Sequence, residues 1–206
     1  MASKDRIQRL KDNTRCNIIS ASLQIVKEEG LSSLSMRKIA DKIEYTAPII
    51  YEYFNSKDAI LTELTSMGFS KLANQMEEAA IQLSDPAQQL KAMWMAYWNF
   101  AFAEEELYQI MFGIEASCCM KNACPQVQRP SKMMLNKIEE IVPAGKRSQE
   151  YIDKKYFTLW SVVHGLISIN MTRTLALRGN EPRNYDDLNK QVLKDALESI
   201  IKSLKD

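Results

Sequence analysis

Apolar residues recur every three or four positions along most of the chain, which is the spacing of one face of an α-helix. In the first such segment Ile18, Ala21 and Ile25 share a face, and Gly30 follows the charged turn that comes after them. A glycine in that place commonly ends a helix. The pattern therefore predicts a first helix that ends at about Glu29.

Two short helices are predicted next, separated by about three or four residues. Ser35 stands where its side chain can cap a helix that ends near Lys42. Thr46 can cap the following helix, and Pro48 lies in its first turn, where a missing N–H costs nothing. Two such helices packed on a longer first helix have the spacing of a helix-turn-helix.

The remainder of the chain also carries helical patterns, with no strand-period alternation and no internal repeat. The segment 149–178 is apolar nearly all round, which is typical of a helix buried on every side. We expect helices over 57–83, 85–103, 104–113, 131–142, 149–178 and 185–204, and an irregular stretch over 117–130.

The composition agrees with a helical, globular protein of two domains. The 206 residues are 46% hydrophobic and include only six glycines and six prolines. Their number exceeds that of a typical single domain. The start is polar without an apolar signal core, and the longest apolar run, residues 92–103, is about half a membrane span. We therefore expect a soluble, cytoplasmic protein that crosses no membrane.

Charge is distributed unevenly, although the net charge is only +1. Residues 1–57 carry ten Lys or Arg against seven Asp or Glu, whereas the remainder carries 17 against 19. A basic segment is typical of a part that binds a polyanion, and a solvated charged face gives the same composition. The charge alone therefore leaves both interpretations open.

The N-terminal region resembles the signature of the TetR family of transcriptional regulators. Residues 34–40 and 50–60, with Ala21 and Gly30 before them, match that signature in order and spacing. The resemblance covers about residues 12–62. The sequence departs from it at Glu44, where the family usually has glycine, at Tyr45 in place of valine, and at Val26 in place of phenylalanine. These departures affect the expected geometry of the turn.

The resemblance implies an all-α fold of two domains. Residues 1–57 would form a three-helix, helix-turn-helix DNA-binding domain, and residues 58–206 a helical bundle that binds an effector and dimerises. It further implies a homodimer that binds double-stranded operator DNA and is released by a small apolar or amphipathic effector. The usual effect in the family is repression of transcription.

The C-terminal half is similar to the effector domain of one TetR subgroup, named for a Trp-His-Gly pattern. The residues that carry this similarity are Tyr97, Phe100, Ala101, Leu107, Tyr108, Met111, Phe112, Trp160, His164 and Gly165.

The family resemblance implies a set of residues that contact DNA. By it, Ser35 and Arg37 approach the DNA backbone or a groove edge, and Ala47 and Pro48 touch bases by apolar contact. Lys57, at a helix start, would hold a phosphate. The full expected set is Ser35, Arg37, Thr46, Ala47, Pro48, Tyr51, Tyr53 and Lys57.

Each of these assignments has a plainer structural alternative. Arg37 could belong to a solvated charged face, and Tyr51 could serve packing. For Phe54 we favour packing. The third predicted helix offers no Asn, Gln or Arg that could pair with a base in two places, so we expect Arg37 to carry much of the base reading.

A surplus of Met and aromatic residues in the C-terminal half favours an apolar effector pocket, because these soft side chains suit a cavity with few polar anchors. Ordinary core packing would give the same stripes, and His164 can be a core residue or a hydrogen-bonding partner for the effector. The expected lining residues are Met93, Trp94, Tyr97, Phe100, Phe112, Phe157, Trp160 and His164.

Dimerisation is expected through the helix near 149–178 and the last helix. The apolar face of the last helix must be covered, and we expect a second chain to cover it. That face consists of Leu193, Leu197, Ile200, Ile201 and Leu204.

The sequence gives no sign of enzymatic chemistry. It has no glycine-rich phosphate loop, nucleophile elbow or metal-spaced acids, and only one histidine. Cys118, Cys119 and Cys124 match no zinc spacing, so we interpret them as incidental reduced thiols, with a thiol sensor as the alternative. We expect no cofactor and no metal. The alternative function is a helical small-molecule-binding protein or enzyme without DNA binding.

Overall fold

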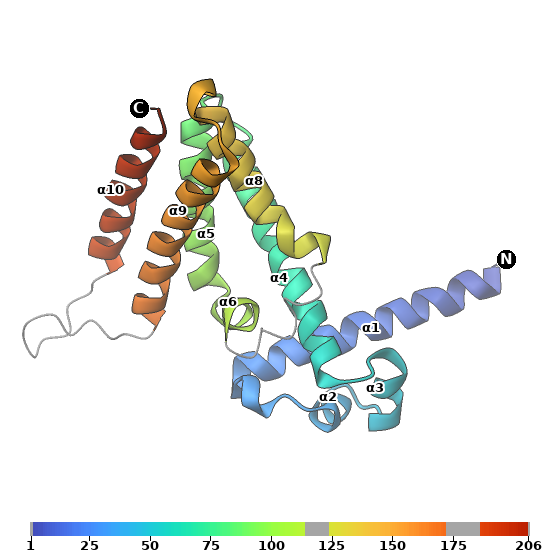
Figure 1. The fold of residues 1–206 in the computed structure, drawn as a ribbon. Helices are drawn as coiled ribbons and strands as arrows, with labels where there is room; N and C mark the ends of the chain where they lie inside the picture. Colours follow the sequence, from blue (N-terminus) through green and yellow to red (C-terminus); the bar gives the residue numbers. More distant parts are fainter. Residues whose placement is uncertain (1, 114–123, 172–185, 206) are drawn as a thin grey trace, which may run out of the picture. The chain divides into compact units, whose positions relative to one another are not determined.

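The computed structural model describes residues 2–113, 124–171 and 186–205, and every regular element in those ranges is a helix (Figure 1). The described chain forms two compact units. The first unit comprises Met1–Lys71 and Glu104–Gln128, and the second comprises Leu72–Ala103 and Arg129–Asp206. The predicted all-α class is confirmed.

The first unit is organised around α1 (Ala2–Glu29), which packs on the first of the two short helices that follow it, and these two short helices pack on each other. Ile18 and Ile25 of α1 are fully buried. α2 (Met36–Lys42) and α3 (Ala47–Tyr53) bury Ile39 and Ile50 in the same unit. The other elements of this unit are the 3-10 turn Leu31–Ser33, the first part of α4 (Lys57–Ala80) and α6 (Glu105–Phe112).

α6 approaches α4 closely at Gly68. A Cβ atom at this position would lie 2.4 Å from Sδ of Met111 and 3.1 Å from Cγ of Leu107. Both of these α6 residues are buried. The absence of a side chain at Gly68 therefore lets the two helices pack at this distance.

The second unit contains α5 (Pro86–Ala103), α9 (Gln149–Met171) and α10 (Asp186–Lys205), with the rest of α4, most of α8 (Pro125–Ile141) and the 3-10 turn Ala144–Lys146. α10 lies beside α9, and both contact α5 (Figure 1). The core holds Trp94, Leu159, Val163, Leu193 and Leu197, all fully buried.

The irregular stretch predicted over 117–130 is wrong at its C-terminal end, because α8 already begins at Pro125. A proline at the first position of a helix needs no intrahelical hydrogen bond. Pro130 lies inside the helix and is buried, so apolar contact offsets the hydrogen bond that its nitrogen cannot donate. Residues 117–123 lie outside the described ranges.

Two predictions about the C-terminal helices need correction. α9 is not buried on all sides, since Phe157 is 58% and Ile169 is 39% exposed. The apolar face of α10 is covered within the chain itself, where Leu193, Leu197 and Leu204 are fully buried. This apolar face is therefore not left open by the single chain, contrary to the expectation. Residues 172–178 of the predicted long helix lie outside the described ranges.

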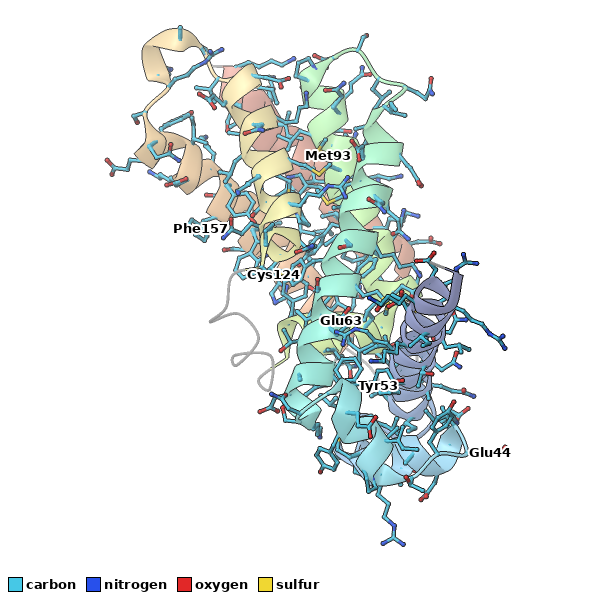
Figure 2. The ribbon with its side chains drawn as sticks, turned by 90° about the vertical axis from the view of Figure 1, so that its right-hand side faces the viewer. Glu44, Tyr53, Glu63, Met93, Cys124 and Phe157 are labelled. Carbon is cyan, nitrogen blue, oxygen red and sulfur yellow. The ribbon has the colours of Figure 1, made fainter. Side chains whose placement is uncertain are left out.

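The turn between α2 and α3 is closed by a residue with left-handed backbone, Glu44, whose φ is 59°. The N–H of Tyr45 donates to the C=O of Ala40 at 2.9 Å, and the N–H of Glu44 to the C=O of Asp41 at 3.4 Å. This pair of hydrogen bonds is a Schellman motif, in which glycine usually takes the left-handed position. Glu44 is exposed and lies at the outer edge of the unit (Figure 2).

We expect Glu44→Gly to raise the free energy of unfolding by roughly 0.5–1 kcal/mol, because glycine adopts a positive φ without the cost that a Cβ imposes. Urea unfolding followed by circular dichroism measures the change. Glu52→Gly is the matched control, since Glu52 is an exposed residue within α3. It should lower stability by about 1 kcal/mol. Equal effects of the two substitutions would contradict strain at Glu44.

Candidate nucleic-acid interface

The start of α2 is fixed by a side-chain cap at Ser35. Its Oγ accepts a hydrogen bond from the backbone N–H of Lys38 at 3.3 Å, as predicted for an N-cap serine. Met36 and Ile39 are buried, so Arg37 lies on the exposed side of the helix. The Ser35 hydroxyl keeps its proton, which it can donate to an acceptor outside the chain.

The basic residues of α2 differ in their partners. Nζ of Lys38 pairs with Oε2 of Glu29, and Nζ of Lys42 pairs with Oε2 of Glu28 at 2.6 Å. The hydrogen bond from Lys42 lowers the pKa of the Glu28 carboxyl. Arg37 forms no hydrogen bond or ion pair with any residue in the described ranges. Its charge is therefore directed to solvent.

α3 buries Ile50 and leaves polar groups at its start. Thr46 occupies the N-cap position with extended backbone, but its side chain makes no capping hydrogen bond. The sequence therefore predicted the cap position correctly but not a side-chain cap. The backbone carbonyl of Thr46 accepts a hydrogen bond instead, from the N–H of Ile49 at 3.0 Å. The exposed Thr46 hydroxyl is left for an external partner.

The other predicted contact residues of α3 differ in exposure. Pro48 is exposed and Ala47 is half-buried. Tyr51 is 54% exposed, which excludes a purely internal packing role for its ring. Tyr53 is half-buried at the end of the helix. α3 therefore presents small apolar groups at its first turn and a tyrosine one turn later.

Arg15 of α1 holds the end of α3, a role that the sequence analysis missed. Its guanidinium donates to the C=O of Tyr53 at 3.3 Å and pairs with Oε2 of Glu63 at 2.8 Å. It also lies over the ring of Phe54, 4.2 Å from the centroid. Tyr53 and Glu63 both lie beside α1 (Figure 2). The single arginine thus ties α3 and α4 to α1.

Lys57 is the first residue of α4, as the sequence predicted. Its Nζ lies 3.4 Å from the C=O of Leu31 in the preceding 3-10 turn. The Oγ of Ser56 accepts the N–H of Ala59 at 3.2 Å and so caps the helix. The half-buried ammonium is held near a helix N-terminus, where an anion is favoured by both the cation and the helix dipole.

The predicted effector-binding residues lie mostly in the second unit. Met93, Trp94, Tyr97 and Phe100 are buried on α5. Oη of Tyr97 lies 3.3 Å from Nδ1 of His164 on α9. The ring of Trp160 stacks on the His164 ring with centroids 4.9 Å apart. Burial lowers the pKa of His164, which favours its neutral form.

Phe112 and Phe157 are not buried together with this group in the second unit. Phe112 belongs to the first unit, where its ring packs 5.4 Å from that of Phe69 and 4.7 Å from that of Tyr108. Phe157 is on α9 but is mostly exposed and projects from the edge of the second unit (Figure 2). Helical periodicity alone did not show which face of its helix Phe112 or Phe157 occupies.

Of the three cysteines in the predicted irregular stretch, Cys118 and Cys119 lie outside the described ranges. Cys124 precedes α8, and its Sγ lies 3.5 Å from Oγ of Ser66 and 2.5 Å from Oε1 of Gln126. The hydrogen bond with Ser66 lowers the pKa of this thiol. Among the described residues, no group of three or more His, Cys, Asp or Glu side chains is arranged to hold a metal ion.

Two family models match this chain. The model described as "Bacterial regulatory proteins, tetR family" matches residues 18–64, which contain α2, α3 and the start of α4. The model described as "Tetracyclin repressor-like, C-terminal domain" matches residues 90–195, about half of the chain. The chain belongs to the TetR family of bacterial regulatory proteins. The predicted family is confirmed, and α2 and α3 supply the two short helices of the predicted helix-turn-helix.

Curated relatives of this TetR-family chain are distant. An uncharacterized HTH-type transcriptional regulator of Haemophilus influenzae is 27% identical over 54% of this chain and 59% of its own length. The transcriptional activator FasR of Mycolicibacterium smegmatis is 22% identical over 50% of this chain and 47% of its own. The transcriptional repressor NicS of Pseudomonas putida is 23% identical over 48% and 47%. The matches thus span about half the length of these relatives.

Solved structures share the fold over nearly the whole TetR-family chain. A protein of unknown function from Rhodococcus sp. RHA1 has a TM-score of 0.73 at 19% identity and covers 93% of this chain and 95% of its own. RolR in complex with its ligand resorcinol has a TM-score of 0.64 at 12% identity and covers 95% and 89%. None of the described helices is long and apolar enough to cross a membrane.

We expect Arg15→Ala to lower the free energy of unfolding of this TetR-family protein by about 1–2 kcal/mol. The variant loses a partly exposed ion pair, a cation–π contact and a hydrogen bond to the end of α3. Urea unfolding measures the loss. Arg15→Lys should keep part of the stability, and Arg6→Ala, at an exposed site on the same helix, should change it by less than about 0.5 kcal/mol. A neutral Arg15→Ala variant would contradict this structural role.

Proposed function

We propose that this protein is a sequence-specific transcriptional repressor that leaves its operator DNA when a small, apolar or amphipathic effector binds. It would act as a homodimer in the cytoplasm, where the DNA lies. The observation that best supports DNA binding is the outward surface of α2 and α3. There, Arg37 has no partner within the described chain, and Thr46 and Tyr51 are exposed.

Each proposed contact follows from the chemistry of its residue. Arg37 would pair with a base edge or a phosphate, because its guanidinium presents a fork of donors. Pro48 and Ala47 would contact thymine methyl groups, and Thr46 would contribute a hydroxyl. Tyr51, Tyr53, Lys57 and Ser35 would hold phosphates and so fix the register. We keep all eight of these residues as the proposed DNA-contact set.

We propose that residues 58–206 act as the effector and dimerisation domain, and that residues 1–57 are the DNA-binding domain, called the reading head below. α4 supports this arrangement, because it is one continuous helix from Lys57 to Ala80 and its residues belong to both compact units. An effector that shifts α4 would move the reading head. An effector that weakens operator affinity tenfold must bind the DNA-bound form tenfold more weakly, a coupling of about 1.4 kcal/mol.

We infer that the effector site lies in the second unit, and that the chain belongs to the Trp-His-Gly subgroup. The contact between Tyr97 and His164 and the stacking of Trp160 support this, since they join the named aromatic residues to the single histidine. Resorcinol, the ligand of the similarly folded RolR, is likewise a small aromatic molecule. We keep Met93, Trp94 and Phe100 as further lining residues, and leave Phe112 and Phe157 out of the proposed site.

Dimerisation is proposed through the outer faces of α9 and α10. These helices lie side by side, and both leave apolar side chains exposed. On α9 these are Phe157 and Ile169, and on α10 they are Leu188 and Val192. Ser161 and Gly165, which follow Phe157 at four-residue spacing, would let a second subunit approach closely.

The DNA-contact set predicts different effects for Lys57 and Arg37. Lys57→Ala should weaken binding to operator and random duplexes alike, and flatten the dependence on salt by about one phosphate per subunit. Arg37→Ala should cost about 1–3 kcal/mol per contact and relax the choice of sequence. The measurement is fluorescence anisotropy at several salt concentrations, with an operator selected from genomic fragments by the purified wild type.

Lys38→Ala is the matched control for Arg37→Ala, because Lys38 is the next residue but is already paired with Glu29. It should change specific binding less than Arg37→Ala does. Equal losses on operator and random DNA for Arg37→Ala would remove Arg37 from the base-reading set. Wild-type protein that is not retained on duplex DNA at moderate salt would contradict the proposed function as a whole. A promoter that contains the operator, fused to a reporter gene, then tests whether the protein represses or activates transcription. Activation would contradict the proposed repressor.

The proposed interface predicts that Phe157→Asp yields folded monomers with weaker operator binding, because a buried, unpaired carboxylate would oppose association. Light scattering after size-exclusion chromatography measures the mass. Ile81→Asp is the matched control: Ile81 is 70% exposed and belongs to neither α9 nor α10, so this variant should stay dimeric. A wild type that is monomeric at micromolar concentration would overturn the proposed dimer.

A further inference from the structure

The interior of the second unit contains a polar hydrogen without an acceptor. Trp94 on α5 is fully buried, and its Nε1–H has no hydrogen-bond partner among the described residues. An indole N–H can only donate a hydrogen bond, so it needs an acceptor atom such as an oxygen. Buried donors without a partner are rare in folded proteins, and each one calls for a physical explanation, such as a bound group that supplies the acceptor.

The side chains around Trp94 form an aromatic cluster with one polar edge. The ring of Tyr97 lies 5.8 Å from that of Trp94 in an edge-on arrangement, and the ring of Tyr156 lies 6.2 Å away. The polar edge is the Tyr97 hydroxyl with His164. The ring of Trp160 stacks on the ring of His164. Trp160 and His164 are half-buried, so this side of the cluster is partly exposed to solvent.

The ionisable groups of this cluster are held in their neutral forms. Burial raises the pKa of Tyr156 to about 12, and burial lowers the pKa of His164. At pH 7 neither side chain therefore supplies a charge. A carboxylate or ammonium ligand placed among them would lose its hydration without gaining a counter-charge from them, which is strongly unfavourable. An uncharged ligand would not meet this cost.

We propose that the Nε1–H of Trp94 is the hydrogen-bond donor for an uncharged effector with an aromatic or otherwise apolar body and one acceptor oxygen, such as a ketone or ester. This inference rests on the proposed effector-binding function and assigns the ligand class of that site. The ligand's apolar body lies among the Tyr97, Tyr156 and Trp160 rings. Its oxygen accepts the hydrogen bond from the Trp94 Nε1–H, which has no acceptor among the described residues.

Three naphthalenes of nearly equal shape test this chemistry: 2-acetylnaphthalene, which carries a neutral acceptor, 2-isopropylnaphthalene, which has none, and 2-naphthoate, which is an anion. Isothermal titration at pH 7 gives the affinity of each for the wild type and for Trp94→Phe. In the wild type the ketone should bind about tenfold more tightly than the hydrocarbon, and the naphthoate more weakly than the ketone. In Trp94→Phe the preference for the ketone should fall to about twofold or less.

Trp98→Phe is the matched control, because Trp98 is another buried tryptophan of α5 and its nitrogen is not among the described buried atoms that lack a partner. It should keep the tenfold preference. Circular dichroism and the melting temperature report whether each variant is folded. Trp98→Phe that loses the preference as Trp94→Phe does would overturn the assignment of the donor.

The remaining outcomes separate this inference from the proposed function. Equal affinities of ketone and hydrocarbon in the wild type, a preference that survives Trp94→Phe, or no binding of the ketone would each overturn the inference. Retention of the wild type on duplex DNA is measured on the same preparation. If DNA binding holds while the ketone preference is absent, the ligand class alone is wrong. If DNA binding is absent, the proposed function fails independently of Trp94.

Discussion

The proposed DNA-contact surface of this protein depends on the burial of two helices that are too short to be stable alone. α2 and α3 have seven residues each, whereas isolated helices below about 12–15 residues are marginal in water. Ile39 and Ile50 are buried, so one face of each helix packs in the core. Arg37 and Tyr51 therefore lie on the outward faces. The positions of the residues proposed to meet DNA are therefore a consequence of apolar packing behind them, and Arg15 and the turn at Glu44 fix the remaining freedom of α3.

The fold was largely predictable because periodicity and capping act locally. Ser35 caps α2 as expected, and α4 begins at Lys57 as expected. What could not be predicted depends on partners distant in sequence. The contact of Arg15 with Tyr53 spans 38 positions, and no local pattern distinguishes Arg15 from other surface arginines. Glu44, where the sequence departs from the family pattern, is the one non-glycine residue among those described that has a positive φ.

The candidate effector site was predictable in composition and much less so in arrangement. Tyr97 and His164 are brought together by packing of α5 on α9, which a sequence pattern cannot specify. Phe157 shows the limit of periodicity, because a helix with apolar residues on several faces has no single core side. Its exposure assigns it to the outer face of α9. Exposure, not hydrophobicity, thus separates the proposed interface residues from the proposed pocket residues.

A hydrogen-bond donor buried without a partner also bears on how an effector could act. A ligand shifts an equilibrium between two conformations only by the difference between its affinities for them. Apolar contacts spread over an aromatic cluster change gradually as helices slide, whereas a hydrogen bond to Trp94 weakens steeply with distance and angle. If α5 holds Nε1–H in reach of the ligand oxygen in only one conformation, that single bond supplies most of the discrimination. The unmet donor would then set the direction of the switch, while the surrounding rings supply affinity without preference.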